Sequence, residues 1–197
     1  MPLAEALLSV VLAAAAPCGP SGAETYAQTD RTRVYDGGFT DVHPSAWACM
    51  RGRRPVPLDP VDDEFETQQV LERPVALNRR YAAYAVERDI YEGASPESYV
   101  DVHVLDIERR RKRVSCGCRA FRRDGIGYTG EVTDIVVGER GAVAWIGSRH
   151  LIAWDERGHR ELDTGARRGT LELRGGRLTW RHRGGSRRTA TLRGRLR

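Results

Sequence analysis

The chain has almost no lysine: of its 32 basic residues, Lys112 alone is not an arginine. An arginine bias this strong, with abundant alanine and glycine, is typical of a high-GC genome and is not by itself a phosphate-binding signal, although arginine suits bidentate contacts with anions. Long apolar runs are also lacking. The run at residues 6–16 has 11 residues, too few to span a bilayer, and no later run is long enough. We therefore expect a mature chain without a transmembrane segment.

Motifs that carry known chemistry are also missing. No glycine-rich phosphate loop leads from a strand into a helix, and no G-x-S-x-G nucleophile elbow is present. The five histidines are scattered, and none has zinc-ligand spacing with a cysteine. The acidic run at residues 59–66 lacks the spacing of a calcium-binding loop and is interpreted as a solvated connector. We expect no catalytic residue, no cofactor and no metal site.

The N-terminus has two features of a signal peptide, the apolar run at residues 6–16 and the small residues at 21–23. They predict a signal peptide at residues 1–23, followed by a single mature domain at residues 24–197. The chain departs from the usual pattern at its start, which carries Glu5 and no basic residue. The protein is expected to be secreted or associated with the cell envelope.

Cysteine is scarce, with Cys18, Cys49, Cys116 and Cys118 in the whole chain. Lipidation of Cys18 is less favoured than its removal with the signal peptide, because a proline precedes it. Removal of Cys18 leaves three cysteines, and an oxidising compartment favours a pair among them. We expect Cys49 to bond Cys116 or Cys118, and a direct Cys116–Cys118 bond is the strained alternative.

The second half of the chain combines frequent glycine with short apolar runs, which favours turn-rich β structure. Three of its segments can be aligned: residues 78–85, 139–146 and 174–181. Tyr84, Trp145 and Trp180 fall in one column of this alignment. Because scaffold residues recur at the same point of each repeat, we expect these three rings to fill the core between packed sheets.

The spacing of apolar residues predicts two kinds of strand. Residues 142–146 are apolar at both odd and even positions, which indicates an inner strand covered on both faces. Residues 99–106 instead alternate: the valines share one face, while Asp101 and His103 share the other. This second pattern predicts a half-buried strand.

The repeats predict an all-β fold of about four antiparallel β-meander units, arranged as a small or incomplete β-propeller. The units are expected at residues 32–66, 67–118, 130–167 and 168–197. The succession LNRRYAAYAVE, VTDIVVGERGAVAWI and LELRGGRLTWRH resembles the β-propeller-like repeats, of the TolB and WD40-like kind, of short secreted proteins of uncharacterised function from high-GC bacteria. The resemblance implies an exported propeller-like protein and implies no catalytic residue.

Charge is distributed unevenly along the chain. Residues 24–106 carry 16 acidic residues and 9 arginines, whereas residues 157–197 carry 13 arginines and 3 acidic residues. A basic segment of this kind can form a polyanion-binding face, for which Arg181, Arg187 and Arg188 are the candidate contacts. The alternatives are attraction between the two halves of the fold, or arginines on solvated strand exteriors.

Two aromatic residues are further candidate contacts. Trp154 has no aromatic counterpart in the other repeats. Tyr91 lies in the segment 87–98, which contains glycine and proline and is predicted to be a long loop suited to binding.

Together these features favour a secreted, non-enzymatic interaction or envelope-associated protein. Its expected partner is an unknown protein or polysaccharide, and nucleic acid is not expected. One alternative is a propeller-type carbohydrate-active hydrolase or lyase, which would need two of Asp101, Asp134 and Asp155 in one pocket. The other is a polyanion-binding module that uses the arginine-rich C-terminal segment.

Overall fold

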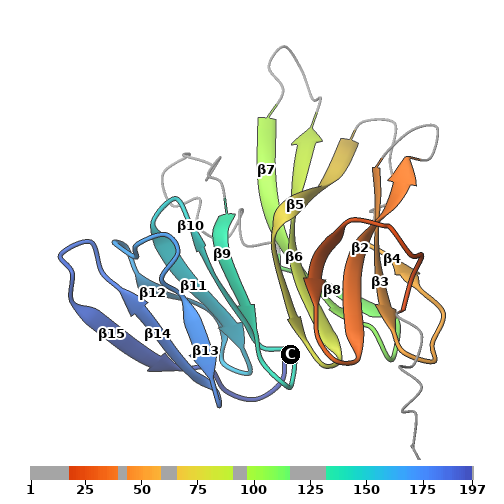
Figure 1. Cartoon of the computed structure of the whole chain (residues 1–197). Helices are drawn as coiled ribbons and strands as arrows, with labels where there is room; N and C mark the ends of the chain where they lie inside the picture. Colours follow the sequence, from red (N-terminus) through yellow and green to blue (C-terminus); the bar gives the residue numbers. More distant parts are fainter. Residues whose placement is uncertain (1–17, 40–43, 59–65, 91–96, 116–131, 197) are drawn as a thin grey trace, which may run out of the picture.

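The computed structural model describes residues 18–39, 44–58, 66–90, 97–115 and 132–196, and the regular structure within these ranges is β-strand (Figure 1). The strands form four antiparallel sheets in which neighbours along the chain are also neighbours in the sheet, and none of the four closes on itself. In the part of the chain described, no helix is long and apolar enough to cross a membrane. The predicted all-β fold of antiparallel meanders is confirmed.

The first sheet contains β1 (Thr25–Gln28), β2 (Thr32–Phe39), β3 (Pro44–Met50) and β4 (Val56–Pro57). The second contains β5 (Glu66–Asn78), β6 (Tyr81–Ile90), β7 (Glu97–Asp106) and β8 (Arg111–Ser115). The third contains β9 (Val132–Val137), β10 (Val143–Gly147), β11 (His150–Asp155) and β12 (Gly158–Asp163). The fourth contains β13 (Glu172–Arg174), β14 (Arg177–Arg181) and β15 (Arg187–Thr191).

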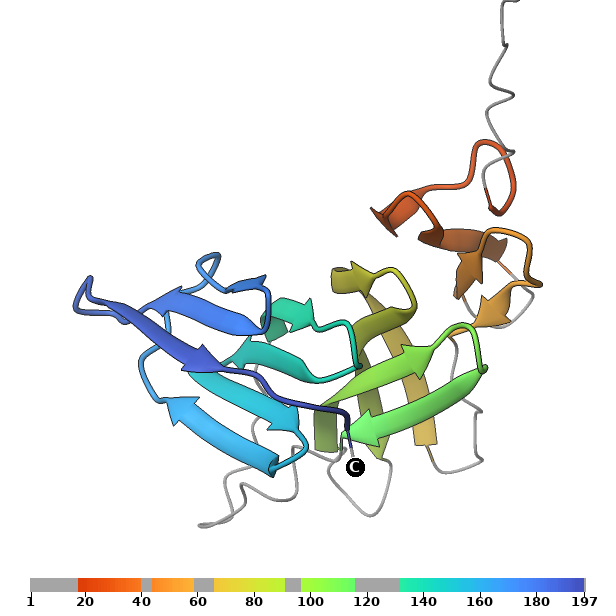
Figure 2. The ribbon, with the colours of Figure 1, turned by 90° about the horizontal axis from the view of Figure 1, so that it is seen from below.

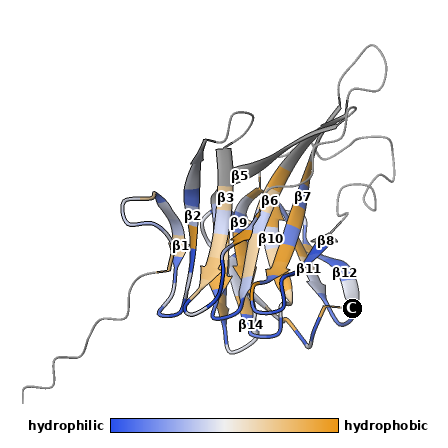
Figure 3. Ribbon diagram, turned by 90° about the vertical axis from the view of Figure 1, so that its right-hand side faces the viewer, coloured by the Kyte–Doolittle hydropathy of each residue, from blue (hydrophilic) through white to orange (hydrophobic). Residues whose placement is uncertain are grey.

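The sheets pack against one another in chain order, with a hydrophobic cluster between each successive pair. Val34 and Val86 lie between the first and second sheets, Val104 and Val143 between the second and third, and Ile146 with Leu178 between the third and fourth. Figure 3 shows the hydrophobic residues along the strands and hydrophilic residues at the turns of the lower edge. Burial of apolar surface between sheets is therefore the main stabilising term.

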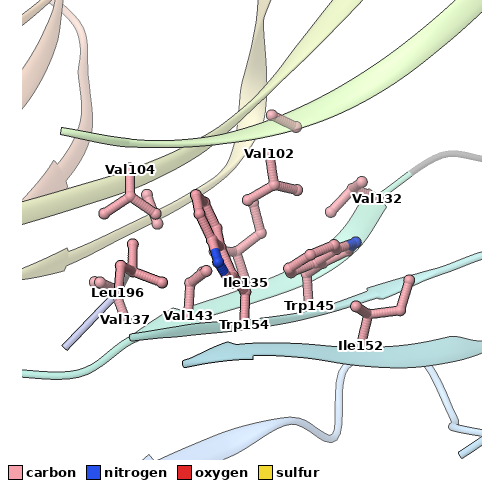
Figure 4. Packing of buried hydrophobic residues seen from close by; sticks show 12 residues of the cluster. Val102, Val104, Val132, Ile135, Val137, Val143, Trp145, Ile152, Trp154 and Leu196 are labelled. Atoms are coloured by element: carbon pink, nitrogen blue, oxygen red, sulfur yellow. The ribbon is translucent and has the colours of Figure 1, made fainter. Parts of the chain in front are cut away.

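The aromatic column predicted from the repeats is part of this core. Tyr84, Trp145 and Trp180 are 0%, 4% and 4% exposed. Each lies on the second strand of its sheet. Each also belongs to the hydrophobic cluster that its sheet shares with the preceding sheet. Figure 4 shows Trp145 among valines and isoleucines of the second and third sheets. The interpretation of the column as core is confirmed.

The predicted burial is correct for β10 and wrong for β7. In β10, Val143 and Trp145 face the second sheet while Ala144 and Ile146 face the fourth, as expected for an inner strand. In β7, Asp101 and His103 are each 3% exposed rather than solvated. Their face is covered because the first sheet packs against it, and β7 is buried on both sides.

The outer face of the first sheet is covered by residues 18–23. A disulfide joins Cys18 to Cys49 on β3, and a Cβ atom added at Gly19 would lie 2.7 Å from the Tyr35 ring. The guanidinium of Arg33, which is 8% exposed, donates hydrogen bonds to the main-chain carbonyls of residues 20 and 23. We call residues 18–23 the N-terminal cap.

The cap corrects the expected partner of Cys49 and bears on the predicted cleavage site. The partner of Cys49 is Cys18, so the expected bond to Cys116 or Cys118, which lie outside the described residues, is wrong. Cleavage after residue 23 would remove Cys18 and both carbonyl acceptors of Arg33. A mature chain that keeps these contacts would have to begin at or before Cys18.

The C-terminal segment, residues 192–196, returns from the fourth sheet towards the second, as Figure 2 shows. The main-chain N–H of Arg193 donates to the buried carboxylate of Asp155 at 2.9 Å. Leu196 is 5% exposed and packs between the second and third sheets, where its carbonyl accepts a hydrogen bond from Arg113. This segment therefore fastens three sheets together.

Candidate anion-binding face

The fourth sheet has one buried face and one open face. On β14, Leu178 and Trp180 are buried against the third sheet, and the alternate residues Arg177, Thr179 and Arg181 point to the opposite side. No strand among the described residues packs on that side. We call it the outer face of the fourth sheet.

Strand register places arginines opposite arginines on the outer face. Arg174 on β13 pairs with Arg177 on β14, and Arg181 on β14 pairs with Arg187 on β15. Like charges directly opposite each other in a sheet are destabilising. This face therefore carries four arginines in two cross-strand pairs of like charge.

The remaining positions of the outer face are threonines and one acid. A shallow hollow of about 540 Å³ is lined by Glu172, Arg174, Arg177, Thr179, Arg187 and Thr189. Glu172 approaches Arg174 at 3.6 Å, but both side chains are more than half exposed, so water screens this pair. The net charge of the face stays strongly positive, and its hydroxyl and guanidinium groups are all hydrogen-bond donors.

Arg188, the third arginine predicted as a contact, has a different role. It lies opposite Trp180 and forms an ion pair of 3.0 Å with Asp163. The same carboxylate accepts hydrogen bonds from Trp180 Nε1 at 2.6 Å and from the main-chain N–H of Gly165 at 3.0 Å. Arg188 thus neutralises a buried acid instead of completing the outer face.

Burial would by itself raise the pKa of Asp163. The hydrogen bonds from Trp180, Gly165 and His182, with the charge of Arg188, outweigh burial and hold the pKa of this carboxyl below its usual value. Asp163 is therefore ionised at neutral pH and serves as the charged centre of the contact between the third and fourth sheets.

The aromatic candidates are not part of the outer face. Trp154 is 7% exposed and packs in the cluster between the second and third sheets (Figure 4). It also stacks on the His159 ring, with centroids 4.8 Å apart. This burial argues against Trp154 as a ligand contact. Tyr91 lies outside the described residues.

The predicted loop at residues 87–98 is shorter than expected. β6 continues to Ile90 and β7 begins at Glu97, and these two residues are cross-strand partners. The hairpin extends into the predicted loop because β5 also pairs there, with Glu66 opposite Ile90. Residues 91–96 are outside the described part of the chain.

The three carboxylates considered for catalysis lie in different places. Asp101 is buried in β7, between the first and second sheets. Asp134 accepts hydrogen bonds from the main-chain N–H groups of Gly169 and Leu171, at 2.9 and 3.4 Å, and so holds the segment before β13. Asp155 is fully buried and accepts from Arg157 and Arg160 at 3.0 and 2.7 Å. These contacts position sheets and turns.

Among the residues that the structure describes, no group of three or more His, Cys, Asp or Glu side chains could hold a metal ion.

Sequence reasoning missed Arg174 and Arg177. The signal is the tetrapeptide Arg174-Gly175-Gly176-Arg177, since a two-residue glycine turn places the flanking residues opposite each other. Comparison with known proteins adds no further guidance: no protein-family model, no curated protein and no solved structure matches this chain.

Proposed function

We propose that this chain is an exported, non-enzymatic module that binds an anionic polymer on the outer face of its fourth sheet. The observation that carries the proposal is the pairing of Arg174 with Arg177 and of Arg181 with Arg187 on one open face. Two repelling pairs on a face that nothing in the described structure covers are stabilised when an anion shares each pair. The Cys18–Cys49 disulfide supports an oxidising, extracytoplasmic location.

The residue types on the face favour an acidic polysaccharide over a nucleic acid. Proteins that bind single strands stack bases on aromatic rings. The only ring in β13–β15 belongs to Trp180, which is 4% exposed and points into the core. Arginine and threonine are donors suited to carboxylate and sulfate groups, which recur along such polysaccharides.

The alternative of a carbohydrate-active hydrolase or lyase is less well supported. It requires two carboxylates that share a pocket and have separated pKa values. Asp134 and Asp155 are each occupied by main-chain or arginine donors, and Asp101 lies between a different pair of sheets.

We also propose that the four sheets are the blades of an incomplete propeller. The face-to-face packing of successive sheets in chain order supports this arrangement, as does the recurrence of an aromatic residue on the second strand of three sheets. In this arrangement the N-terminal cap covers one open end, and the outer face of the fourth sheet is the other.

Binding to heparin, a sulfated polysaccharide, tests the proposed function. Replacing Arg181 and Arg187 by glutamine in R181Q/R187Q should weaken binding about five- to tenfold at 0.15 M salt. It should also reduce the magnitude of the negative slope of log K against log salt concentration by roughly one to two, because two ionic contacts are lost. The fold should persist, since Thr170 binds the main-chain N–H of Arg181 and not its side chain.

The matched control is R53Q/R54Q, which removes two charges from an exposed turn of the first sheet. Equal retention of the two variants on a heparin column would contradict the proposal, because only net charge would then matter. Deletion of residues 181–197 is unsuitable as a test, since it also removes β15 and the buried Leu196.

A further inference from the structure

A second group of arginines lies where the second sheet, the third sheet and the C-terminal segment meet. A cleft of about 110 Å³ is lined there by Tyr81, Asp106 and five arginines: Arg109, Arg111, Arg113, Arg140 and Arg195. They come from three separate parts of the chain, namely the β7–β8 hairpin, the turn before β10 and the C-terminal segment. The fold therefore gathers positive charge here that the sequence keeps apart.

The one acid in the cleft does not balance these charges. Burial would raise the pKa of Asp106, but the hydrogen bond from Arg80 and the main-chain N–H of Arg109 outweigh it and keep the carboxyl ionised. Arg80 does not line the cleft. It donates to the Asp106 carboxylate through both Nε and a terminal nitrogen and so neutralises the charge of Asp106. Asp106 is thus already paired.

Among the described residues, the cleft arginines contact a main-chain carbonyl, and the charge of Arg109 acts on Asp106. Arg113 donates to the carbonyl of Leu196. Within the described residues, no carboxylate forms an ion pair with the side chains of Arg109, Arg111, Arg140 or Arg195. Several guanidinium groups around a small concave site repel one another, and an anionic group bound between them removes that repulsion. The volume suits one sulfate or carboxylate group.

The cleft is linked to the outer face of the fourth sheet. A second hollow, of about 370 Å³, has Glu139, Arg140, Gly175, Gly176 and Gly194 among its lining residues. Arg140 also lines the cleft, and the two glycines form the turn between Arg174 and Arg177 of the outer face. The second hollow therefore shares Arg140 with the cleft and borders the turn that carries Arg174 and Arg177.

We propose that this arginine cleft is a second binding point for the same anionic polymer, taking one of its sulfate or carboxylate groups. The inference rests on the proposed function and specifies the ligand as an extended chain that passes over the Gly175-Gly176 turn. A polymer held at two linked points gains affinity because the second contact is intramolecular.

The test is heparin binding by R111Q/R140Q, compared with R181Q/R187Q and with the control R53Q/R54Q. Arg111 and Arg140 are exposed and belong to different parts of the cleft wall. R111Q/R140Q should bind long heparin about five- to tenfold more weakly than the wild type. The magnitude of its negative slope of log K against log salt concentration should fall by roughly one to two. A heparin tetrasaccharide should show a much smaller loss, because a short chain engages one point at a time.

The outcomes separate the two proposals. If R111Q/R140Q binds long heparin like the control while R181Q/R187Q is weakened, the cleft inference is overturned and the proposed function stands. If only R111Q/R140Q is weakened, the outer face is the wrong site and the cleft alone binds the polymer. If neither differs from the control, both proposals fail. Unchanged circular dichroism and melting temperature establish that each variant is folded.

Discussion

Loss of the Cys18–Cys49 disulfide is expected to lower the free energy of unfolding by about 3 to 4 kcal/mol. The bond closes a loop with a sequence separation of 31, and the chain-entropy account gives a cost of this size for a loop of that length. The same change releases the N-terminal cap, so Tyr35, now 3% exposed, meets water and Arg33 loses its carbonyl acceptors. Urea denaturation of C18S/C49S against the wild type measures the loss.

The matched variant is C116S/C118S, which should keep the Cys18–Cys49 bond and most of the stability. Peptide mapping under non-reducing conditions distinguishes the two pairings directly. Recovery of Cys49 linked to Cys116 or Cys118 would show that the cap is not fastened in this way.

The cap also has a consequence for maturation. A mature chain that keeps the disulfide must retain Cys18, so we expect the intact mass of the mature protein to include residues 18–23. A mass that corresponds to a chain starting at Glu24 would contradict this expectation. In that case the outer face of the first sheet would lose the cover that residues 18–23 now provide.

Removal of the Asp163 carboxylate is expected to cost about 3 kcal/mol. In D163A, Trp180 Nε1 and the main-chain N–H of Gly165 lose their acceptor in a buried site, and each unsatisfied buried donor costs about 1 to 3 kcal/mol. The control E161Q lies on the same strand and changes an exposed side-chain contact with His150, which is worth less than about 1 kcal/mol. Equal effects of the two variants in urea denaturation would contradict the assigned role.

The stabilisation by Asp163 should depend on pH in a defined direction. Its pKa in the folded protein lies below the value of 3.8 for an unperturbed aspartate, so the folded state favours the ionised form. The contribution of this ionisation is therefore complete above the unfolded pKa and is lost as the pH falls through the lower, folded pKa. The difference in unfolding free energy between wild type and D163N should shrink below about pH 4. A difference that is constant from pH 7 to pH 3 would exclude this linkage.

Residue patterns were sufficient for local structure and for part of the core. Alternation with a period of two depends only on backbone geometry, so it identified β10 as apolar on both faces. The recurrence of Tyr84, Trp145 and Trp180 identified core positions, because each packed sheet needs a large side chain at the same point. Charge counts located the basic segment but not the face on which its arginines lie.

Tertiary structure decided which faces are covered and which distant residues meet. Alternation says that Asp101 and His103 share a face of β7, but only the packing of the first sheet buries that face. The same limit applies to Cys49, whose partner depends on the path of the N-terminal cap.

For the candidate site, too, part could be predicted from the sequence and part depended on the tertiary structure. The sequence by itself determined that arginines accumulate near the C-terminus, with Arg181 and Arg187 among them. Strand register placed these two opposite each other, and the packing of Trp180 against the third sheet left them on the open face. Sheet packing brought Arg111 and Arg195 to one cleft, because contacts between residues so far apart in the chain depend on the whole fold and not on local preference.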